Sequence, residues 1–156
     1  MKKGLPPNLN ILSVSCGGTH TCAILQSSDQ FSPGSSYVYT WGSNDSGQLG
    51  YEKDMRKGNF EPNVVSDLEG KRVIQVACGY SHTLALTVEG NVYAWGCNKY
   101  GQLGHPNIGG NVNKPFGISF FDSSEEKKVI QIAAGGRFSA ALTKGPLFSL
   151  LFCVLI

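Results

Sequence analysis

The stretch VYTWGSNDSGQLG at residues 38–50 returns as VYAWGCNKYGQLG at residues 92–104, which lie 54 positions further along the chain. A second segment occurs three times, as SCGGTHTCAI at residues 15–24, ACGYSHTLAL at residues 77–86 and AAGGRFSAAL at residues 133–142. Recurrence at such a period indicates that one supersecondary unit repeats and buries its faces against its neighbours.

The first copy of the repeat carries an insertion. Gly17 and Trp41 are 24 residues apart, whereas the equivalent Gly79 and Trp95 are 16 apart, so eight extra residues lie within residues 26–36. This stretch, QSSDQFSPGSS, has the composition of a loop. Long loops on rigid scaffolds often carry function, although many are only tolerated. We take it as the candidate partner-binding loop, with these residues as candidates: Gln26, Asp29, Phe31 and Pro33.

The repeated pattern VxxVAxGxxHTxALTxxGxVYxWGxNxxGQLG resembles the repeat of the regulator of chromosome condensation family. The resemblance covers residues 73–104 nearly throughout, residues 11–50 apart from the insertion, and residues 129–143 as the opening of a third copy. A continued register would place Gly and Trp where the chain has Pro146 and Leu151. Repeats of the family form a seven-bladed β-propeller, so the resemblance implies an all-β fold that is a partial propeller arc of four-stranded blades.

The length limits how much of a propeller this chain forms. The smallest propellers have four blades, which takes roughly 220 residues at this period, so 156 residues with about 2.7 repeats are not expected to close a ring alone. The expected organisation is an N-terminal tail at 1–10, a first repeat at 11–70, a second repeat at 71–126, the start of a third at 127–144, and an apolar tail at 145–156.

Each repeat reads as a small antiparallel sheet. Residues 73–77, 82–86 and 92–95 are short runs rich in β-branched and aromatic residues, separated by turn segments, which predicts three strands. A fourth strand is expected near residues 115–120, and in the first copy near residues 63–66.

The second strand of each repeat predicts how the sheets stack. Side chains alternate between faces along a strand. His82, Leu84 and Leu86 share one face, and the other face carries only Thr83 and Ala85. The same split recurs in all three copies, so we expect the large side chains of one blade to pack on the small ones of the next.

Two histidines, His20 and His82, occupy one repeat position where Phe138 stands in the third copy. A position that accepts phenylalanine indicates a structural role, with the imidazole hydrogen-bonded to the backbone. The tryptophans are expected to be core residues, the asparagines to form turns, and the glycines to allow positive φ or close approach. We therefore interpret the following as structural residues of the repeat: Gly17, His20, Trp41, Gly42, Asn44, Gly47, Gly50, Gly79, His82, Gly90, Trp95, Gly96, Asn98, Gly101, Gly104 and Gly135.

Charge and motifs exclude several function classes. The formal net charge is +2, and charged residues mix in sign, so the chain has no basic face of the kind that binds nucleic acid. It contains no phosphate-binding loop, no GxSxG nucleophile motif and no HExxH zinc motif. We expect no catalytic activity, no cofactor and no metal site.

The cysteines favour a reducing compartment. Five cysteines without a CxxC pair argue against a zinc site or a secreted disulfide framework. Cys16 and Cys78 share a repeat position with Ala134, so both are expected to be small buried residues. No signal-peptide pattern opens the sequence. We therefore expect an intracellular location, cytoplasmic or nuclear.

The last ten residues, LFSLLFCVLI at 147–156, are apolar and have no counterpart in the repeat. They are too few to span a bilayer, which needs about 20 residues. Three interpretations remain open: a replacement third strand of the incomplete blade, a tail produced by alternative termination of a longer chain, and a membrane contact.

Two functions of different class follow. The favoured one is a protein–protein interaction module, interpreted as a shortened piece of a larger propeller protein, with self-association through its uncovered ends. The alternative implied by the resemblance is a guanine-nucleotide exchange factor for a small GTPase. A third interpretation is a truncated product without function.

Overall fold

The computed structural model describes residues 9–28, 34–51, 59–105, 109–119 and 128–145. It contains ten strands and one short helix: β1 (Leu9–Cys16), β2 (His20–Ser27), β3 (Ser36–Gly42), β4 (Asn59–Val64), the 3-10 helix η1 (Ser66–Leu68), β5 (Val73–Cys78), β6 (His82–Thr87), β7 (Val92–Gly96), β8 (Val112–Gly117), β9 (Val129–Ala134) and β10 (Ser139–Thr143).

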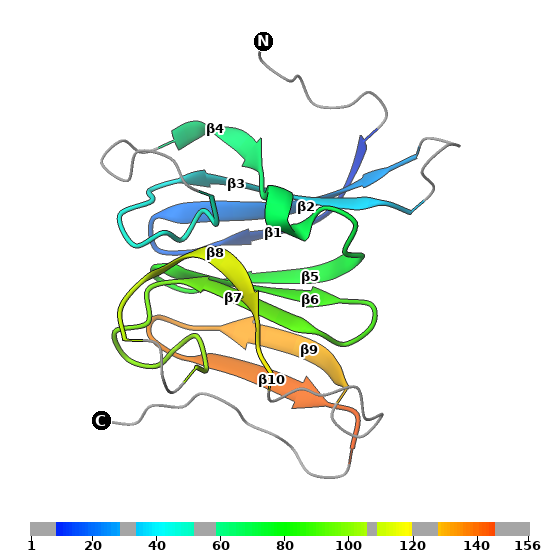
Figure 1. Ribbon diagram of the computed structural model, residues 1–156. Coiled ribbons are helices and arrows are strands. Elements are labelled where there is room, and N and C mark those ends of the chain that lie inside the picture. Colours follow the sequence, from blue (N-terminus) through cyan, green and yellow to red (C-terminus); the bar gives the residue numbers. More distant parts are fainter. Residues whose placement is uncertain (1–8, 29–33, 52–58, 106–108, 120–127, 146–156) are drawn as a thin grey trace.

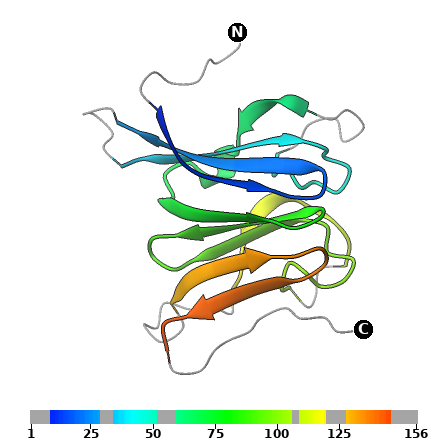
Figure 2. The same cartoon turned by 180° about the vertical axis from the view of Figure 1, so that it is seen from behind.

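The strands form three antiparallel sheets stacked face to face (Figure 1). The first blade has the order β1-β2-β3-β4, the second has β5-β6-β7-β8, and β9 pairs with β10 in the third. Seen from behind, the three layers follow one another in sequence order (Figure 2). The all-β arc expected from the repeat is confirmed.

The fourth strands begin earlier than expected. β4 begins at Asn59 and β8 at Val112, whereas the sequence placed them near residues 63–66 and 115–120. Each contains a proline, Pro62 or Pro115, which lacks an N–H for the β ladder. An outermost strand pairs along one edge only and accommodates proline in its interior, so the proline did not mark the start of the strand.

Large side chains of one blade pack on small ones of the next, as predicted. Every residue of β6 is buried, which shows that both faces of the middle sheet are covered. The interface of the first two blades contains Cys22, Ile24, Val73, Val76, Cys78 and Ala85. The interface of the second and third blades contains Leu84, Leu86, Val129, Ile132, Ala134 and Ala141.

Side chains also tie the inner strands of neighbouring blades. The carboxamide of Gln75 on β5 donates to the Ile132 carbonyl at 2.8 Å and accepts from the Ile132 N–H at 2.9 Å. It thereby satisfies backbone groups of β9, whose edge away from β10 pairs with no strand in the described part of the chain. An unpaired strand edge invites aggregation, and this bond pair covers part of it.

The outer face of the first blade is not covered by another sheet in the described part of the chain. Ile11 and Val14 of β1 are 68% and 55% exposed, although the equivalent Val73 and Val76 of β5 are 1% and 5% exposed. The residue types are alike, so the difference comes from the blade that packs on β5. An apolar face of this kind favours association.

We therefore expect the 156-residue chain to self-associate, with a sedimentation coefficient that rises with concentration. Changing Ile11 and Val14 together to lysine should return it to a monomer, because two charges would have to be desolvated in the contact. Ile74→Lys is the matched control: Ile74 is 51% exposed on an inner strand but lies outside this face. A concentration-independent monomer before any substitution would contradict the prediction.

Candidate functional site

The insertion in the first repeat lengthens the hairpin between β2 and β3. In the second blade the pairing of β6 with β7 ends at Leu86 and Val92. In the first blade it continues beyond the equivalent residues to two further pairs, Leu25 with Tyr37 and Gln26 with Ser36. Part of the inserted stretch is therefore strand, and its interpretation as a loop is wrong at Gln26, Ser27 and Ser36.

A hydrophobic contact explains the extension. Leu25 is buried, and it forms a small apolar cluster with Ala23 and Tyr39, against which Tyr37 packs. Composition alone hid this strand because serine dominates the remainder of the insertion. Of the candidate loop residues, Gln26 is half-buried at the end of β2, and Asp29, Phe31 and Pro33 lie outside the described residues.

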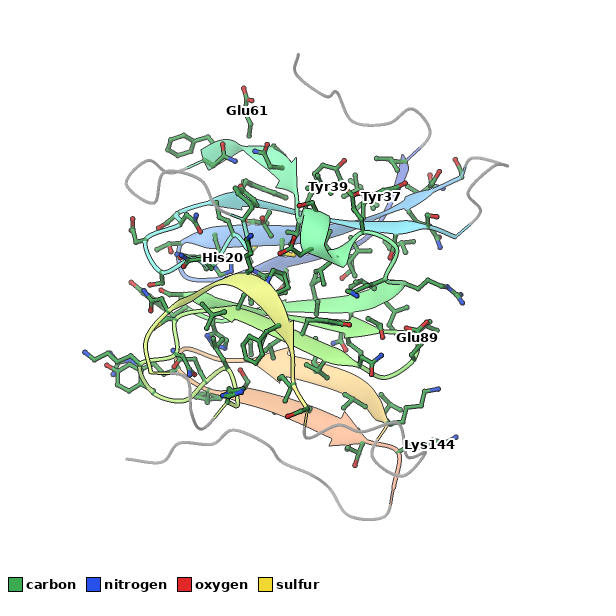
Figure 3. All side chains as sticks on the ribbon, viewed as in Figure 1. His20, Tyr37, Tyr39, Glu61, Glu89 and Lys144 are labelled. Carbon is green, nitrogen blue, oxygen red and sulfur yellow. The ribbon has the colours of Figure 1, made fainter. Side chains whose placement is uncertain are left out.

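A hollow of about 170 Å³ lies beside the base of this hairpin. The Ser36 hydroxyl donates to the Lys71 carbonyl at 3.3 Å, which joins the hairpin to the turn that precedes β5. Figure 3 shows Tyr37 and Tyr39 on the first sheet near η1, the helix before that turn. The residues lining the hollow are Ser35, Ser36, Tyr37, Glu69, Gly70, Lys71 and Arg72.

The hollow combines both signs of charge with neutral hydrogen-bonding groups. Lys71 and Arg72 are its cations, and Glu69 is its carboxylate. The Lys71 ammonium lies 5.2 Å from the centre of the Tyr93 ring, and this cation–π contact restrains the side chain. Burial, followed by the nearby Tyr37 and Glu69, raises the pKa of Tyr39, which lies on β3 near the hollow without lining it.

The structural residues of the repeat meet at the blade interfaces. The Gln48 carbonyl of the first blade accepts from the Trp95 indole N–H and from the Thr83 hydroxyl of the second, each at 2.8 Å. His20 Nε2 lies 2.8 Å from the same hydroxyl. The next interface repeats the arrangement, since the Ser139 hydroxyl donates to the carbonyl of Gln102.

These bonds fix the tautomer of the histidines. The Thr83 hydroxyl has one proton, which it gives to the Gln48 carbonyl, so it must accept from a protonated His20 Nε2. His82 Nε2 lies 2.9 Å from the Ser139 hydroxyl, and the same argument applies. Figure 3 shows His20 between the first and second sheets. The sequence predicted histidines bonded to the backbone. The structure gives each Nε2 a hydroxyl across the interface, and His82 also has a backbone hydrogen bond with Phe138.

The two tryptophans differ although they occupy the same repeat position. Trp95 is fully buried between blades, whereas Trp41 is half-buried on the outer face of the first blade. Cys16 is likewise exposed and Cys78 buried, which corrects the expectation for Cys16. In each pair, the residue without a neighbouring blade in the described structure is the accessible one.

Asparagine and glycine shape the segment that follows each tryptophan. The Asn44 side-chain oxygen accepts from the Leu49 N–H at 3.0 Å, and Asn98 does the same for Leu103 at 2.9 Å. A Cβ on Gly50, whose φ is +78°, would lie 2.8 Å from Trp95 Nε1. The sequence-predicted glycines with positive φ are Gly42, Gly47, Gly50, Gly90, Gly96, Gly101 and Gly104.

Close approach explains the remaining three glycines. A Cβ on Gly79 would lie 2.6 Å from the Gly135 carbonyl, and it would also strike the His82 ring. Gly17 and Gly135 are crowded in the same way by the ring of the following repeat residue, His20 or Phe138. The structure thus brings Trp95, the two histidines and these glycines to the blade interfaces, whereas Trp41 stays on the outer face of the first blade.

Two negative findings concern the described ranges only. No group of three or more His, Cys, Asp and Glu side chains there is placed to hold a metal ion. Among the same residues, no helix is long and apolar enough to cross a membrane.

Comparison with known families decides the assignment. The model of the regulator of chromosome condensation (RCC1) repeat matches residues 36–86 and 89–142, and a second model of the same repeat matches residues 11–48 and 73–102. The chain belongs to the RCC1 repeat family. The matches place family repeats on all three blades of the structure.

Several RCC1-repeat proteins are similar in sequence. The chain is 39% identical over 135 residues to the mitochondrial RCC1 domain-containing protein RUG3 of Arabidopsis thaliana, covering 86% of this chain and 27% of RUG3. It is 37% identical to the ultraviolet-B receptor UVR8 of the same plant, covering 86% of this chain and 28% of UVR8. The human probable E3 ubiquitin-protein ligase HERC4 is 37% identical, with 88% of this chain and 12% of HERC4 covered. The chain therefore spans about a quarter or less of these relatives.

Solved RCC1-type structures share the fold. Human WBSCR16 superposes with a TM-score of 0.68 at 30% identity, over 86% of this chain and 31% of that one. Prp20p of Saccharomyces cerevisiae, described with its binding to Gsp1p and histones, gives a TM-score of 0.68 at 23% identity, over 87% and 31%. The second likeness shows the fold alone.

Proposed function

We propose that this RCC1-repeat chain is a protein-interaction module that binds a partner at the β2–β3 hairpin and the hollow beside it. One observation carries the proposal: the hairpin is longer than its counterpart in the second repeat by two residue pairs and a longer turn. The repeat closes its equivalent turn without this addition, so the extra length is not needed for the blade to form.

The base of the hairpin is rigid enough to present a binding surface. Its strands are paired to residues 26 and 36, the Ser27 N–H donates to the Ser35 carbonyl at 2.9 Å, and Ser36 bonds to the turn before β5. A preorganised surface loses less entropy on binding than a flexible one. Contacts made here can therefore contribute to affinity without first ordering the site.

The chemistry of the hollow suits a side chain of a protein partner. A volume of about 170 Å³ admits one side chain rather than a cofactor. Lys71 and Arg72 can pair with a partner carboxylate, and Glu69 can accept from a donor beside it. Binding at protein interfaces often depends on a few such anchors.

Deletion of residues 27–34 tests the site. It leaves five residues between Ile24 and Val38, the same number as between Leu86 and Val92 in the second repeat. We expect an unchanged circular dichroism spectrum and an unfolding free energy within about 0.5 kcal/mol, because the second repeat forms its blade without these residues, of which only Ser27 belongs to a described strand. Partner capture should be lost.

Capture is measured with a photo-crosslinking residue at Ser28, and with the same residue at Glu61 on β4 as the matched control. Partners should crosslink at Ser28 only, and unlabelled intact chain should compete while the deletion variant should not. Competition by the deletion variant, or equal yields at both positions, would remove the hairpin from the site.

Guanine-nucleotide exchange on a small GTPase is the second candidate. The fold that this chain shares with Prp20p favours exchange activity. The binding to Gsp1p is described for Prp20p and not for this chain. Opening a nucleotide site takes a broad preformed surface, and three blades supply only part of one. We expect the chain not to accelerate nucleotide release from small GTPases. Stimulation comparable to that by a complete propeller would make exchange the function.

Neither a catalytic activity nor a location is carried over to this chain from the names of its relatives. The ligase name belongs to HERC4, of which this chain covers 12%. We propose a non-catalytic role for the chain itself. We also propose a cytoplasmic or nuclear location, which microscopy of the tagged chain would test. A mitochondrial location is the alternative outcome, because the relative RUG3 is named as mitochondrial.

A further inference from the structure

Two cysteine thiols meet across the interface of the first and second blades. Cys22 lies on β2 and is fully buried, and Cys78 lies at the end of β5 and is 7% exposed. Both belong to one packed cluster, and their thiols hydrogen-bond each other. Both are free thiols. The contact is therefore between two reduced sulfur atoms held together by the stacking of separate sheets.

Packing alone does not require this pair. Cys22 corresponds in the repeat to Leu84, and Cys78 corresponds to Ala134. Leu84 and Ala134 belong to the apolar interface of the second and third blades. A purely hydrophobic pair thus fills the same position at the interface of the second and third blades. Of these two interfaces, only that of the first and second blades carries a pair of thiols there.

The imidazole of His20 lies beside the pair. Its Nε2 is engaged with Thr83, and its Nδ1 is buried without a hydrogen-bond partner of ordinary geometry. The lone pair of Nδ1 is thus available to accept a proton. A hydrogen bond from the Cys22 thiol is the main cause that lowers the pKa of the Cys78 thiol to about 5. Burial opposes this shift, and His20 and Ser15 add to it.

The two thiols differ in reactivity for a physical reason. Burial, and then the neighbouring Cys78, raises the pKa of Cys22 well above its ordinary value. Since the thiolate is the nucleophile, Cys78 attacks first and Cys22 is the second thiol to react.

Cys78, although buried, is the member of the pair that borders the surface. It borders a shallow surface hollow of about 220 Å³ between the turns that begin the second strand of each blade. Cys22 does not border it. The residues around this hollow are Cys16, Gly17, Gly18, Cys78, Gly79, Tyr80, Gly135 and Gly136.

We propose that Cys22 and Cys78 form a reversible disulfide between the first two blades, by exchange with a small disulfide such as oxidised glutathione. The Cys78 thiolate attacks one sulfur of oxidised glutathione, the bond between its sulfurs breaks, and glutathione thiolate leaves and takes up a proton. Cys22 then loses its proton and attacks Cys78 Sγ, which releases the second glutathione. Two thiols are oxidised, and one disulfide is reduced to two thiols.

The bond would fasten two blades that are otherwise joined by packing and hydrogen bonds. Its two cysteines are 56 positions apart in the sequence, so the cross-link would constrain a long stretch of the unfolded chain. The oxidised arc should therefore resist unfolding more than the reduced arc. The proposal concerns stability of the arc and is independent of the hairpin as a partner site.

The test equilibrates the purified chain in glutathione buffers of rising oxidised fraction, followed by acid quenching and mass spectrometry with peptide mapping. We expect a species lighter by two hydrogens, with the bond mapped to Cys22 and Cys78, that reverts with dithiothreitol. Its midpoint in denaturant should be higher than that of the reduced chain. A bond from Cys78 to Cys16, or no intramolecular bond under the most oxidising buffer, would overturn the proposal.

Two variants separate the roles of the thiols. Cys22→Ala should accumulate glutathione on Cys78, because the second thiol is absent, and Cys78→Ala, which copies Ala134, should leave Cys22 unmodified. Cys97→Ser is the matched control, since Cys97 is half-buried outside the pair, and it should form the bond as the unchanged chain does. Glutathione accumulating on Cys22 in Cys78→Ala would contradict the assigned order.

Discussion

Replacing Trp95 with alanine is expected to lower the free energy of unfolding by about 3–5 kcal/mol, the range for removal of a large aromatic side chain from a core. Trp95 is fully buried between the first two blades. Its indole N–H donates to the Gln48 carbonyl at 2.8 Å, so the change also removes a hydrogen bond across the interface. The midpoint of urea unfolding, followed by far-ultraviolet circular dichroism, measures the loss.

Trp41→Ala provides the matched control. It makes the same change at the same repeat position, but Trp41 is half-buried. In the described structure no preceding blade packs on its indole, as the first blade does on Trp95. We expect a loss well below that of Trp95→Ala. Equal shifts of the two midpoints would mean that the interface does not supply the stability assigned to it.

Acidification is expected to destabilise the chain through His82. Burial, and then the charge of His20, lowers the pKa of His82 from an ordinary 6.5 to about 4. Above pH 6.5 the imidazole is neutral in both the folded and the unfolded chain. As the pH falls from 6.5 to 4, the unfolded chain binds a proton that the folded chain does not, so stability is lost across this window. A shift of this size corresponds to about 3 kcal/mol.

The measurement is urea unfolding at intervals between pH 7.5 and pH 4, for the unchanged chain and for His82→Phe. Phenylalanine is the residue that the third repeat carries at this position, as Phe138. Carboxyl groups titrate in both chains, so the difference between the two curves isolates His82. Parallel curves across the window would contradict the lowered pKa.

The repeat predicted the fold correctly because it is a local signal. Alternation along residues 82–86 indicated one large and one small face, and both are buried as expected. The starts of the fourth strands were misplaced, since β4 begins at Asn59 and β8 at Val112, in each case before a proline that the strand contains. That error came from the edge position of β4 and β8, which a single strand does not reveal.

The candidate site was predicted only in part. Counting residues located the insertion, yet composition concealed that Leu25 and Tyr37 extend the strands. The hollow beside it was not predicted, because Ser36 and Lys71 are brought together by the packing of one blade on the next. The available signal was Leu25, which lies two residues after Ala23 and therefore on the same face of the strand.

By itself, the sequence determined the all-β repeat, the approximate strands and the glycines and asparagines of the turns, since each depends on residues a few positions apart. Tertiary structure alone decided which copy of a repeated residue is buried. Trp41 and Trp95 are equal in the pattern and unequal in exposure, and so are Cys16 and Cys78. The physical reason is that the interface bonds join residues 63 and 57 positions apart, and only stacking of one sheet on the next supplies the partner.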